Sequence, residues 1–140
     1  MSSVILLAAD HPMPSYDPGL QRVSVSGGCT VTAPGFSIQP HVYYRDSVAA
    51  LDLDMKPYRC ELDVAATEEE AALLRTYLES NGSQGEQVEL WHLWLGDDRS
   101  THISRFHGPL SSLDQETLDQ LCNPAPKNGC PGQCRITVTI

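Results

Sequence analysis

The pattern of apolar and polar positions is most regular in the second half of the chain. Apolar residues alternate with charged ones over residues 58–64, which is typical of a strand with one buried face. Apolar residues then recur at helical spacing over residues 67–80, where Thr67 and Glu70 have the spacing of a capping box. Residues 87–95 predict a second strand. This part of the chain is therefore expected to fold as strand, helix and strand.

The same order continues toward the end of the sequence. Residues 96–100 predict a turn, and residues 101–107 predict a returning strand. A second helix is expected to begin at Ser112, and residues 135–140 alternate strictly as a last strand. The resulting order, β-α-β-β-α-β over residues 58–140, is that of a ferredoxin-like split βαβ fold, so an α+β class is expected.

The first 55 residues predict β-structure that accompanies this core. Residues 4–9 form a short apolar run, which is typical of a strand buried on both faces. Residues 21–40 alternate around glycine turns and predict a β-ribbon, whereas residues 41–53 fit either a strand or a short helix over 44–51, which we favour.

We expect one domain over residues 1–140. In it, residues 1–55 are an N-terminal strand and ribbon extension that packs on or extends the sheet of an α+β core, residues 56–140.

The strand at 87–95 is apolar on both of its faces. In a split βαβ sheet this strand lies at an edge, and an uncovered apolar edge invites aggregation. Either the N-terminal segment covers it, with strand 4–9 extending the sheet and ribbon 21–40 packing on the open face, or a second subunit does. We favour the first arrangement, because residues 1–55 otherwise lack a core of their own.

Composition narrows the classes of function. The chain has 18 acidic and 9 basic residues, a formal net charge of −9, and its basic residues are scattered. Nucleic acid and anionic membranes bind clustered positive charge, so neither is an expected partner. No apolar stretch has the length of a membrane span, and the first residues lack a secretory signal pattern. Five cysteines without a disulfide-like spacing favour a soluble protein of the reducing cytoplasm.

Two histidines are candidates for a binding pocket. If residues 96–100 form a hairpin turn, His92 and His102 are diagonal neighbours on one face, with Trp94 and Phe106 beside them. Two imidazoles on a rigid hairpin could begin a metal site or a proton-transfer pair, although no third ligand has a reliable spacing. Two half-buried histidines bonded to hydroxyl or backbone groups explain the same pattern, and this structural explanation is favoured.

The opposite face of the same hairpin also pairs aromatic and charged residues. Trp91 is expected to meet Arg105 in a cation–π contact, and Glu89 is expected to meet His107 in an ion pair. These structural roles account for the four residues without a ligand, although Trp91 stays a candidate binding residue.

Three cysteines precede the last predicted strand. Cys122, Cys130 and Cys134 lie in a Gly/Pro-rich loop that superficially resembles a zinc knuckle. A knuckle needs two closely spaced pairs, and only Cys130 and Cys134 form one, at a spacing that also differs from that of disulfide oxidoreductases. Reduced thiols in a loop are the favoured explanation, and no cofactor is expected.

No phosphate-binding loop, dinucleotide fingerprint or nucleophile elbow is present in the sequence. We therefore expect a non-catalytic binding or assembly module of the cytoplasm, with a homodimer or a protein partner. It would act through strand 87–95, the open face of the sheet, or the loop segment 122–134. The alternatives are a metal-binding or redox protein that uses Cys122, Cys130 and Cys134, and a small enzyme or ligand sensor with a pocket of His92, His102 and Trp94.

Overall fold

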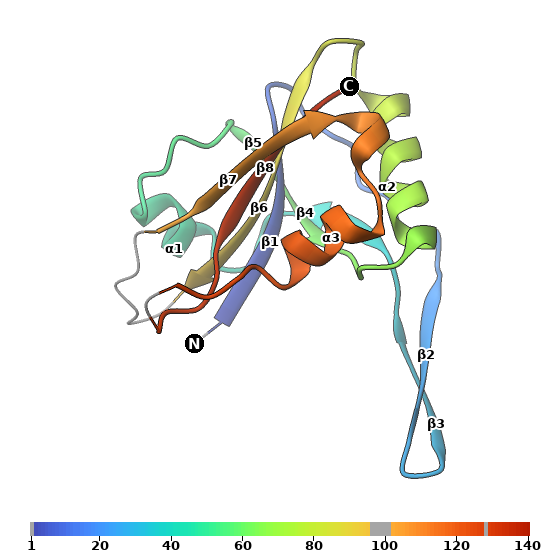
Figure 1. Ribbon diagram of the computed structural model, residues 1–140. Helices are drawn as coiled ribbons and strands as arrows, with labels where there is room; N and C mark the ends of the chain where they lie inside the picture. The colour runs from blue at the N-terminus through green and yellow to red at the C-terminus, as the bar shows by residue number, and fades with distance from the viewer. Residues whose placement is uncertain (1, 96–101, 128) are drawn as a thin grey trace.

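The computed structural model describes residues 2–95, 102–127 and 129–140, and it shows an α+β fold built on one mixed sheet (Figure 1). The sheet has six strands in the order β4-β5-β1-β6-β8-β7, and β2 and β3 form a separate two-stranded ribbon. The strands are β1 (Ser2–Ala9), β2 (Gln21–Ser26), β3 (Cys29–Pro34), β4 (Ser37–Pro40), β5 (Tyr58–Asp63), β6 (Gln87–Leu95), β7 (Ser104–Pro109) and β8 (Cys134–Thr139). The described helices are α1 (Arg45–Ala50), α2 (Glu68–Asn81) and α3 (Gln115–Cys122). None of them has the length and hydropathy needed to cross a membrane.

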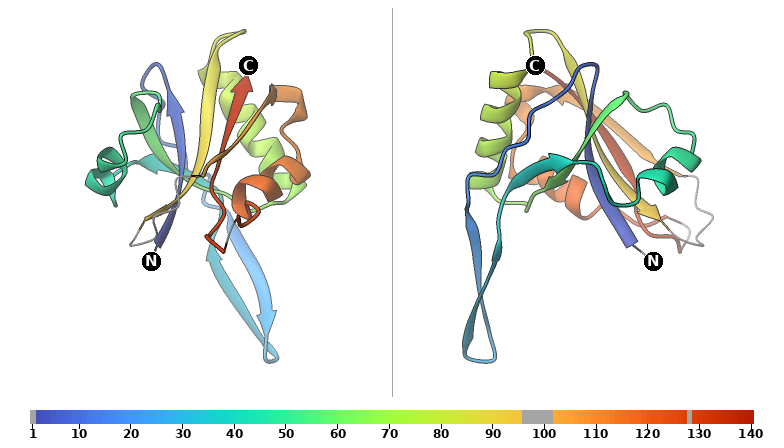
Figure 2. Two further views of the ribbon diagram at one scale, coloured as in Figure 1. Left: turned by 60° about the vertical axis from the view of Figure 1, so that its left-hand side comes forward. Right: turned by 180° about the vertical axis from the view of Figure 1, so that it is seen from behind.

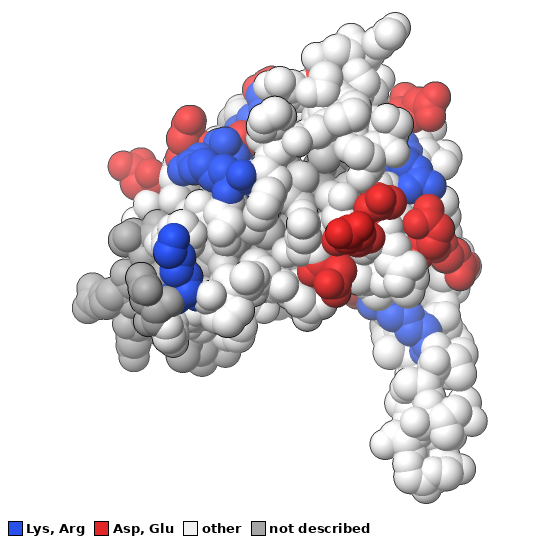
Figure 3. Space-filling view, in the orientation of Figure 1, with Lys and Arg blue, Asp and Glu red and all other residues white. Residues whose placement is uncertain are grey.

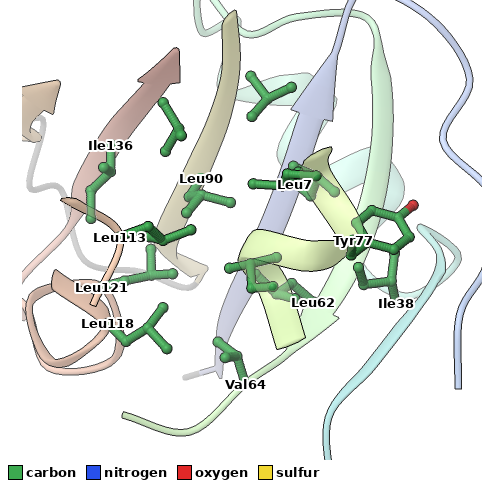
Figure 4. Packing of buried hydrophobic residues seen from close by; sticks show 14 of the residues in the cluster. Leu7, Ile38, Leu62, Val64, Tyr77, Leu90, Leu113, Leu118, Leu121 and Ile136 are labelled. Carbon is green, nitrogen blue, oxygen red and sulfur yellow. The ribbon is translucent and has the colours of Figure 1, made fainter. Parts of the chain in front are cut away.

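One face of the sheet packs against α2 and α3. Alternate residues of the central strands point to this side, among them Leu7, Leu90 and Ile136, and they meet leucines of both helices (Figure 4). The neighbouring strands run antiparallel except β7 and β8, which are parallel. Helix α3 lies in the crossover that joins these two, as a parallel connection requires.

The other face is covered by the segment that contains α1. Val48 of α1 and Met55 of the following loop pack on Trp91 and Leu93 of β6 in a second buried cluster. Figure 2 shows α1 on one side of the sheet and the α2–α3 layer on the other. The sheet is therefore the middle of three layers, and β6 is buried on both faces, as its two-sided apolar pattern requires.

The ferredoxin-like arrangement is not formed, although the chain order from β5 to β8 is the predicted β-α-β-β-α-β. A split βαβ sheet places the first and third strands of that unit side by side, yet β5 and β7 lie far apart in the observed order. The reason is β1, which inserts between β5 and β6 and pairs with both, so that Leu6 lies opposite Glu61 and Trp91. The N-terminal strand is thus part of the core.

Two further predictions are corrected by this order. The strand predicted over 87–95 is not at an edge, because β1 and β8 flank it on either side. The ribbon predicted over 21–40 does not pack on the open face, since α1 and its loop occupy that face. Only its last part, β4, joins the sheet, beside β5.

The helix predictions hold with shifted boundaries. The hydroxyl oxygen of Thr67 accepts the backbone N–H of Glu70 at 3.2 Å and caps α2 as expected. A helix over 44–51 is confirmed by α1. Helix α3 begins later than Ser112, because Leu110–Ser112 forms a 3-10 turn and Asp114 is the N-cap.

The predicted turn at 96–100 lies outside the described residues. The strand predicted to follow it over 101–107 is β7, which begins at Ser104.

Candidate functional site

The ribbon β2–β3, residues 21–34, projects from the body as an arm (Figures 1 and 2). Valine, serine and threonine alternate along both strands, which favours extended backbone. Gly27 and Gly28 have φ values of 58° and 79°, the left-handed pair that a two-residue hairpin turn requires. At the base, the N–H of Gly35 donates to the carbonyl of Leu20 at 2.8 Å and closes the ribbon.

The arm exposes apolar side chains to an unusual degree. Every residue from 23 to 34 is exposed, and Val23, Val25 and Val31 leave 64%, 74% and 50% of their surface accessible. No charged residue occurs between residues 23 and 35, although the whole chain carries −9. An isolated two-stranded ribbon is marginally stable, and an uncharged β-edge is prone to pair with other chains. These are the properties of a surface that another molecule covers.

The β-branched residues of the arm gather on one of its faces. The register pairs Val23 with Thr32 and Val25 with Thr30, and these four side chains form what we call the valine–threonine face. On the other side of the ribbon Ser24 lies opposite Val31. The valine–threonine face is the more continuous apolar surface of the two.

Arg22 fastens the base of the arm to the body. Its guanidinium donates to both carboxylate oxygens of Glu70, at 3.0 Å from Nε and 2.6 Å from Nη2, and to Asp63 at 2.8 Å. The bonds to Glu70 raise the pKa of Arg22, so the guanidinium stays charged. Glu70 is buried in the first turn of α2 and also accepts the N–H of Ala65 at 3.0 Å. The bidentate pair therefore sets the direction of the arm relative to α2.

A groove of about 540 Å³ runs along the outer side of α2. Pro14 and Tyr16 form one wall of this α2 groove, where the Tyr77 hydroxyl donates to the Pro14 carbonyl at 2.6 Å and the rings of Tyr16 and Tyr77 are 5.9 Å apart. The helix contributes Glu69, Ala72, Leu73, Thr76, Tyr77, Ser80 and Asn81.

These positions recur every three or four residues, so the groove follows the helix along its length. Only Glu69 in this lining is charged, and it lies in the first turn of α2. Figure 3 shows a basic patch where the arm joins the body and no charged side chain further along the visible face of the arm, whereas the body carries patches of both signs.

The structure does not bring the two predicted histidines into one pocket. His92 is buried beneath α3, and its Nδ1 is 2.7 Å from the carbonyl oxygen of Leu121. Burial lowers the pKa of His92. His102 is exposed, with its Nε2 at 3.3 Å from the Ser104 hydroxyl. The intervening strand β8 separates them, since Cys134 is the neighbour of both His92 and Ser104 in the sheet.

Trp94 and Phe106 lie in different surroundings. The backbone N–H of Trp94 donates to the side-chain oxygen of Gln133 at 3.0 Å, and the amide of Gln133 donates to the His102 carbonyl at 3.3 Å. Phe106 lies beside Ile136 on the edge strand β7 and lines a small cavity of about 160 Å³. Gln133, which the sequence did not single out, is thus the bridge between the two segments.

Trp91 is fully buried in the second cluster, where its Nε1 donates to Glu89 at 3.2 Å. A cation–π contact is present, but its partner is Arg135, whose guanidinium carbon lies 5.7 Å from the ring centroid. Arg135 also approaches the Glu89 carboxylate at 4.0 Å. The predicted partner Arg105 is one strand further away, because β8 and not β7 is the neighbour of β6.

Cys122 and Cys134 are each hydrogen-bonded to a backbone carbonyl, and Cys130 forms a backbone bridge with Lys127. The Cys122 thiol donates to the Val64 carbonyl at 3.4 Å, and the Cys134 thiol to the Gln120 carbonyl at 3.6 Å. Burial raises the pKa of both thiols to about 11, which disfavours the thiolate that metals and disulfide exchange require. Within the described part of the chain, no three His, Cys, Asp or Glu side chains are grouped to hold a metal ion.

The arm and the α2 groove were not identified as a site from the sequence. The available signals were two uncharged stretches, residues 23–35 and the helix positions Ala72, Leu73, Thr76 and Ser80. Both stretches also fit a buried ribbon and a buried helix face, so they did not indicate exposure. Comparison with known proteins adds nothing further, since no family model, curated protein or solved structure matches this chain.

Proposed function

We propose that this chain is a non-catalytic binding or assembly module that engages a protein partner through the β2–β3 arm. The observation that carries the proposal is the exposure of three valines on an uncharged, projecting ribbon. Burying the accessible parts of Val23, Val25 and Val31 would stabilise a complex by about 3–5 kcal/mol before the cost of association. A ribbon held this way gives a partner both a backbone edge and an apolar face.

This proposal moves the interaction surface away from the segments that the sequence favoured. Strand β6 is buried on both faces, and α1 with its loop occupies the face that was expected to be open. Neither of these can therefore receive a partner without unfolding part of the core. Other apolar side chains are exposed in the described residues, among them Val42 and Tyr43, but the arm combines three exposed valines with an uncharged projecting ribbon.

We place the module in the cytoplasm as part of the same proposal. All five cysteines are unpaired, and two of them are buried against backbone carbonyls. Free thiols are typical of a reducing compartment. A chain of net charge −9 with scattered basic residues also favours a protein partner over nucleic acid.

Thr30→Cys in a Cys29→Ser background places a thiol on the valine–threonine face, whereas Cys29 itself lies opposite Ser26 on the other side of the ribbon. Maleimide labelling of this thiol is measured in a concentrated extract of cells that make the variant in place of the natural protein, and in dilute purified variant. If a partner covers the arm in nine molecules of ten, labelling in the extract should be about tenfold slower, because the reaction follows the uncovered fraction.

The matched control is Ala50→Cys in a Cys29→Ser background, which places an exposed thiol on α1, away from the arm. This thiol should react at the same rate in the extract and in dilute solution. Equal rates for the Thr30→Cys thiol in both conditions would refute the proposed role of the arm.

A further inference from the structure

The arm and the α2 groove have the same length. Each strand of the arm has 6 residues, which span about 20 Å at 3.4 Å per residue. Helix α2 has 14 residues, which span about 21 Å at 1.5 Å per residue. A ribbon laid along the groove would therefore contact it from one end of the helix to the other.

The two surfaces also match in chemistry. The valine–threonine face carries four β-branched side chains and no charge. The groove presents Ala72, Leu73 and Thr76 in its middle, and its charged residue, Glu69, lies at one end. Small residues on the helix allow a flat ribbon to approach closely, and burial of such surfaces leaves no charge without a partner. Each surface thus suits the other better than it suits water.

The arm of a molecule cannot occupy its own groove. All three ribbon views show the arm continuing the line of α2 beyond the N-terminal end of the helix (Figures 1 and 2), whereas the groove is lined by residues of the helix itself. The bonds from Arg22 to Glu70 and Asp63 hold it in that direction. An occupant with the properties of the arm must therefore come from another molecule.

We propose that the α2 groove receives the arm of a second copy of this chain. This inference rests on the proposed function, since it names the partner that the arm engages. Because the arm and the groove are different surfaces, the contact is heterologous, and each copy has one of each. Such contacts join copies head to tail, either into a closed ring or into a filament. Contact through the uncharged arm also limits direct contact between two bodies of like charge.

The test uses two double variants of the full chain. The arm variant carries Val23→Asp and Val25→Asp, and the groove variant carries Ala72→Glu and Thr76→Glu, all at exposed positions. Light scattering after size exclusion, over about 1 to 500 μM, should show wild-type mass rising above the monomer. Each variant should associate at least about a hundredfold more weakly, because the contact would bury unpaired charges.

The decisive experiment mixes the two variants at equal concentration. The groove variant keeps its arm and the arm variant keeps its groove, so the mixture should form a complex of two chains that cannot grow further. Controls at unrelated exposed positions, Val42→Asp and Ala50→Glu, should associate like the wild type. Thermal unfolding followed by circular dichroism checks that every variant keeps the fold.

Each of the other outcomes refutes the inference about the groove, the proposed function of the arm, or both. If the groove variant associates like the wild type while the arm variant does not, the arm binds elsewhere; this inference is wrong and the proposed function stands. If the wild type is monomeric throughout, or the mixture stays monomeric, the inference is wrong, and protection of the Thr30→Cys thiol alone decides the proposed function. If the arm variant associates like the wild type, the arm does not mediate self-association and the inference is wrong.

Discussion

The buried imidazole of His92 should make the stability of the protein depend on pH. Only 6% of this residue is exposed, and its Nδ1 lies 2.7 Å from the Leu121 carbonyl oxygen, so Nδ1–H is the donor of that bond. Its Nε2 is buried without a partner among the described residues. Protonation would place a positive charge at Nε2 in an apolar site, which is why burial lowers the pKa of His92.

The direction of the effect follows from proton linkage. The pKa of His92 is lower in the folded state than the value of 6.5 in the unfolded state, so the unfolded chain binds more protons near that pH. The contribution of the neutral His92 to the free energy of unfolding is complete above pH 6.5. It is lost as the pH falls from 6.5 toward the lower pKa that His92 has in the folded state. One such histidine changes the free energy of unfolding by at most about 1.4 kcal/mol per pH unit. His41 should also lower the free energy of unfolding as the pH falls, because burial lowers its pKa as well.

The assay is urea unfolding between about pH 7.5 and pH 5.5, followed by tryptophan fluorescence. His92→Asn keeps a donor for Leu121 and removes the titration. At the higher pH the variant should be less stable than the wild type, because the lost ring leaves a cavity. On acidification its free energy of unfolding should fall less steeply than that of the wild type, by up to about 1.4 kcal/mol per pH unit. The exposed His102→Asn is the matched control and should keep the wild-type slope. An unchanged slope in His92→Asn would show that this imidazole does not titrate as argued.

Three further changes test the packing by urea unfolding. Trp91→Ala should cost about 3–5 kcal/mol, since the ring is fully buried between β6 and α1; a loss under about 1 kcal/mol would contradict that burial. Thr67→Ala should cost about 1 kcal/mol through the lost N-cap of α2, whereas Thr76→Ala, exposed in the middle of the helix, should cost nothing; equal effects would argue against the cap. Gly132→Ala should cost about 2 kcal/mol or more, because the added Cβ would overlap the Pro124 carbonyl; a neutral result would mean that this loop is less tightly packed.

Local patterns predicted the elements of the second half of the chain well. The alternation in β5, the capped helix α2 and the strand β6 are each encoded within a few neighbouring residues. The order of the strands is not local in this sense. A strand that is apolar on both faces must be buried, but this property does not say which strands flank it. In the structure β1 lies between β5 and β6 and pairs with both.

The candidate site shows the same limit in its side chains. The predicted contact of Trp91 with Arg105 was wrong, because the arginine that reaches the ring depends on which strand is the neighbour of β6, and this is Arg135 of β8. The ribbon was predicted over residues 21–40, of which residues 21–34 form it and β4 joins the main sheet instead; its position was not predicted. The sequence of an uncharged ribbon is compatible with a buried position and with an exposed one. Here the ribbon is not on the sheet because Val48 of α1 and Met55 of the following loop cover that face.

This competition for the sheet explains why the arm is exposed. Each face of a sheet can be covered once, and here α2 with α3 covers one face while α1 covers the other. The ribbon then has no face of the sheet left to fold onto, and Arg22 directs it away from the body through a buried carboxylate that also stabilises the start of α2. A ribbon that were only a connection between β1 and β4 would gain solubility from charged residues, as exposed β-edges usually do. The arm instead carries valines and threonines, and the same chain has an uncovered groove along α2, a helix of similar length to the arm. This is the reason to look for the partner among copies of the protein itself.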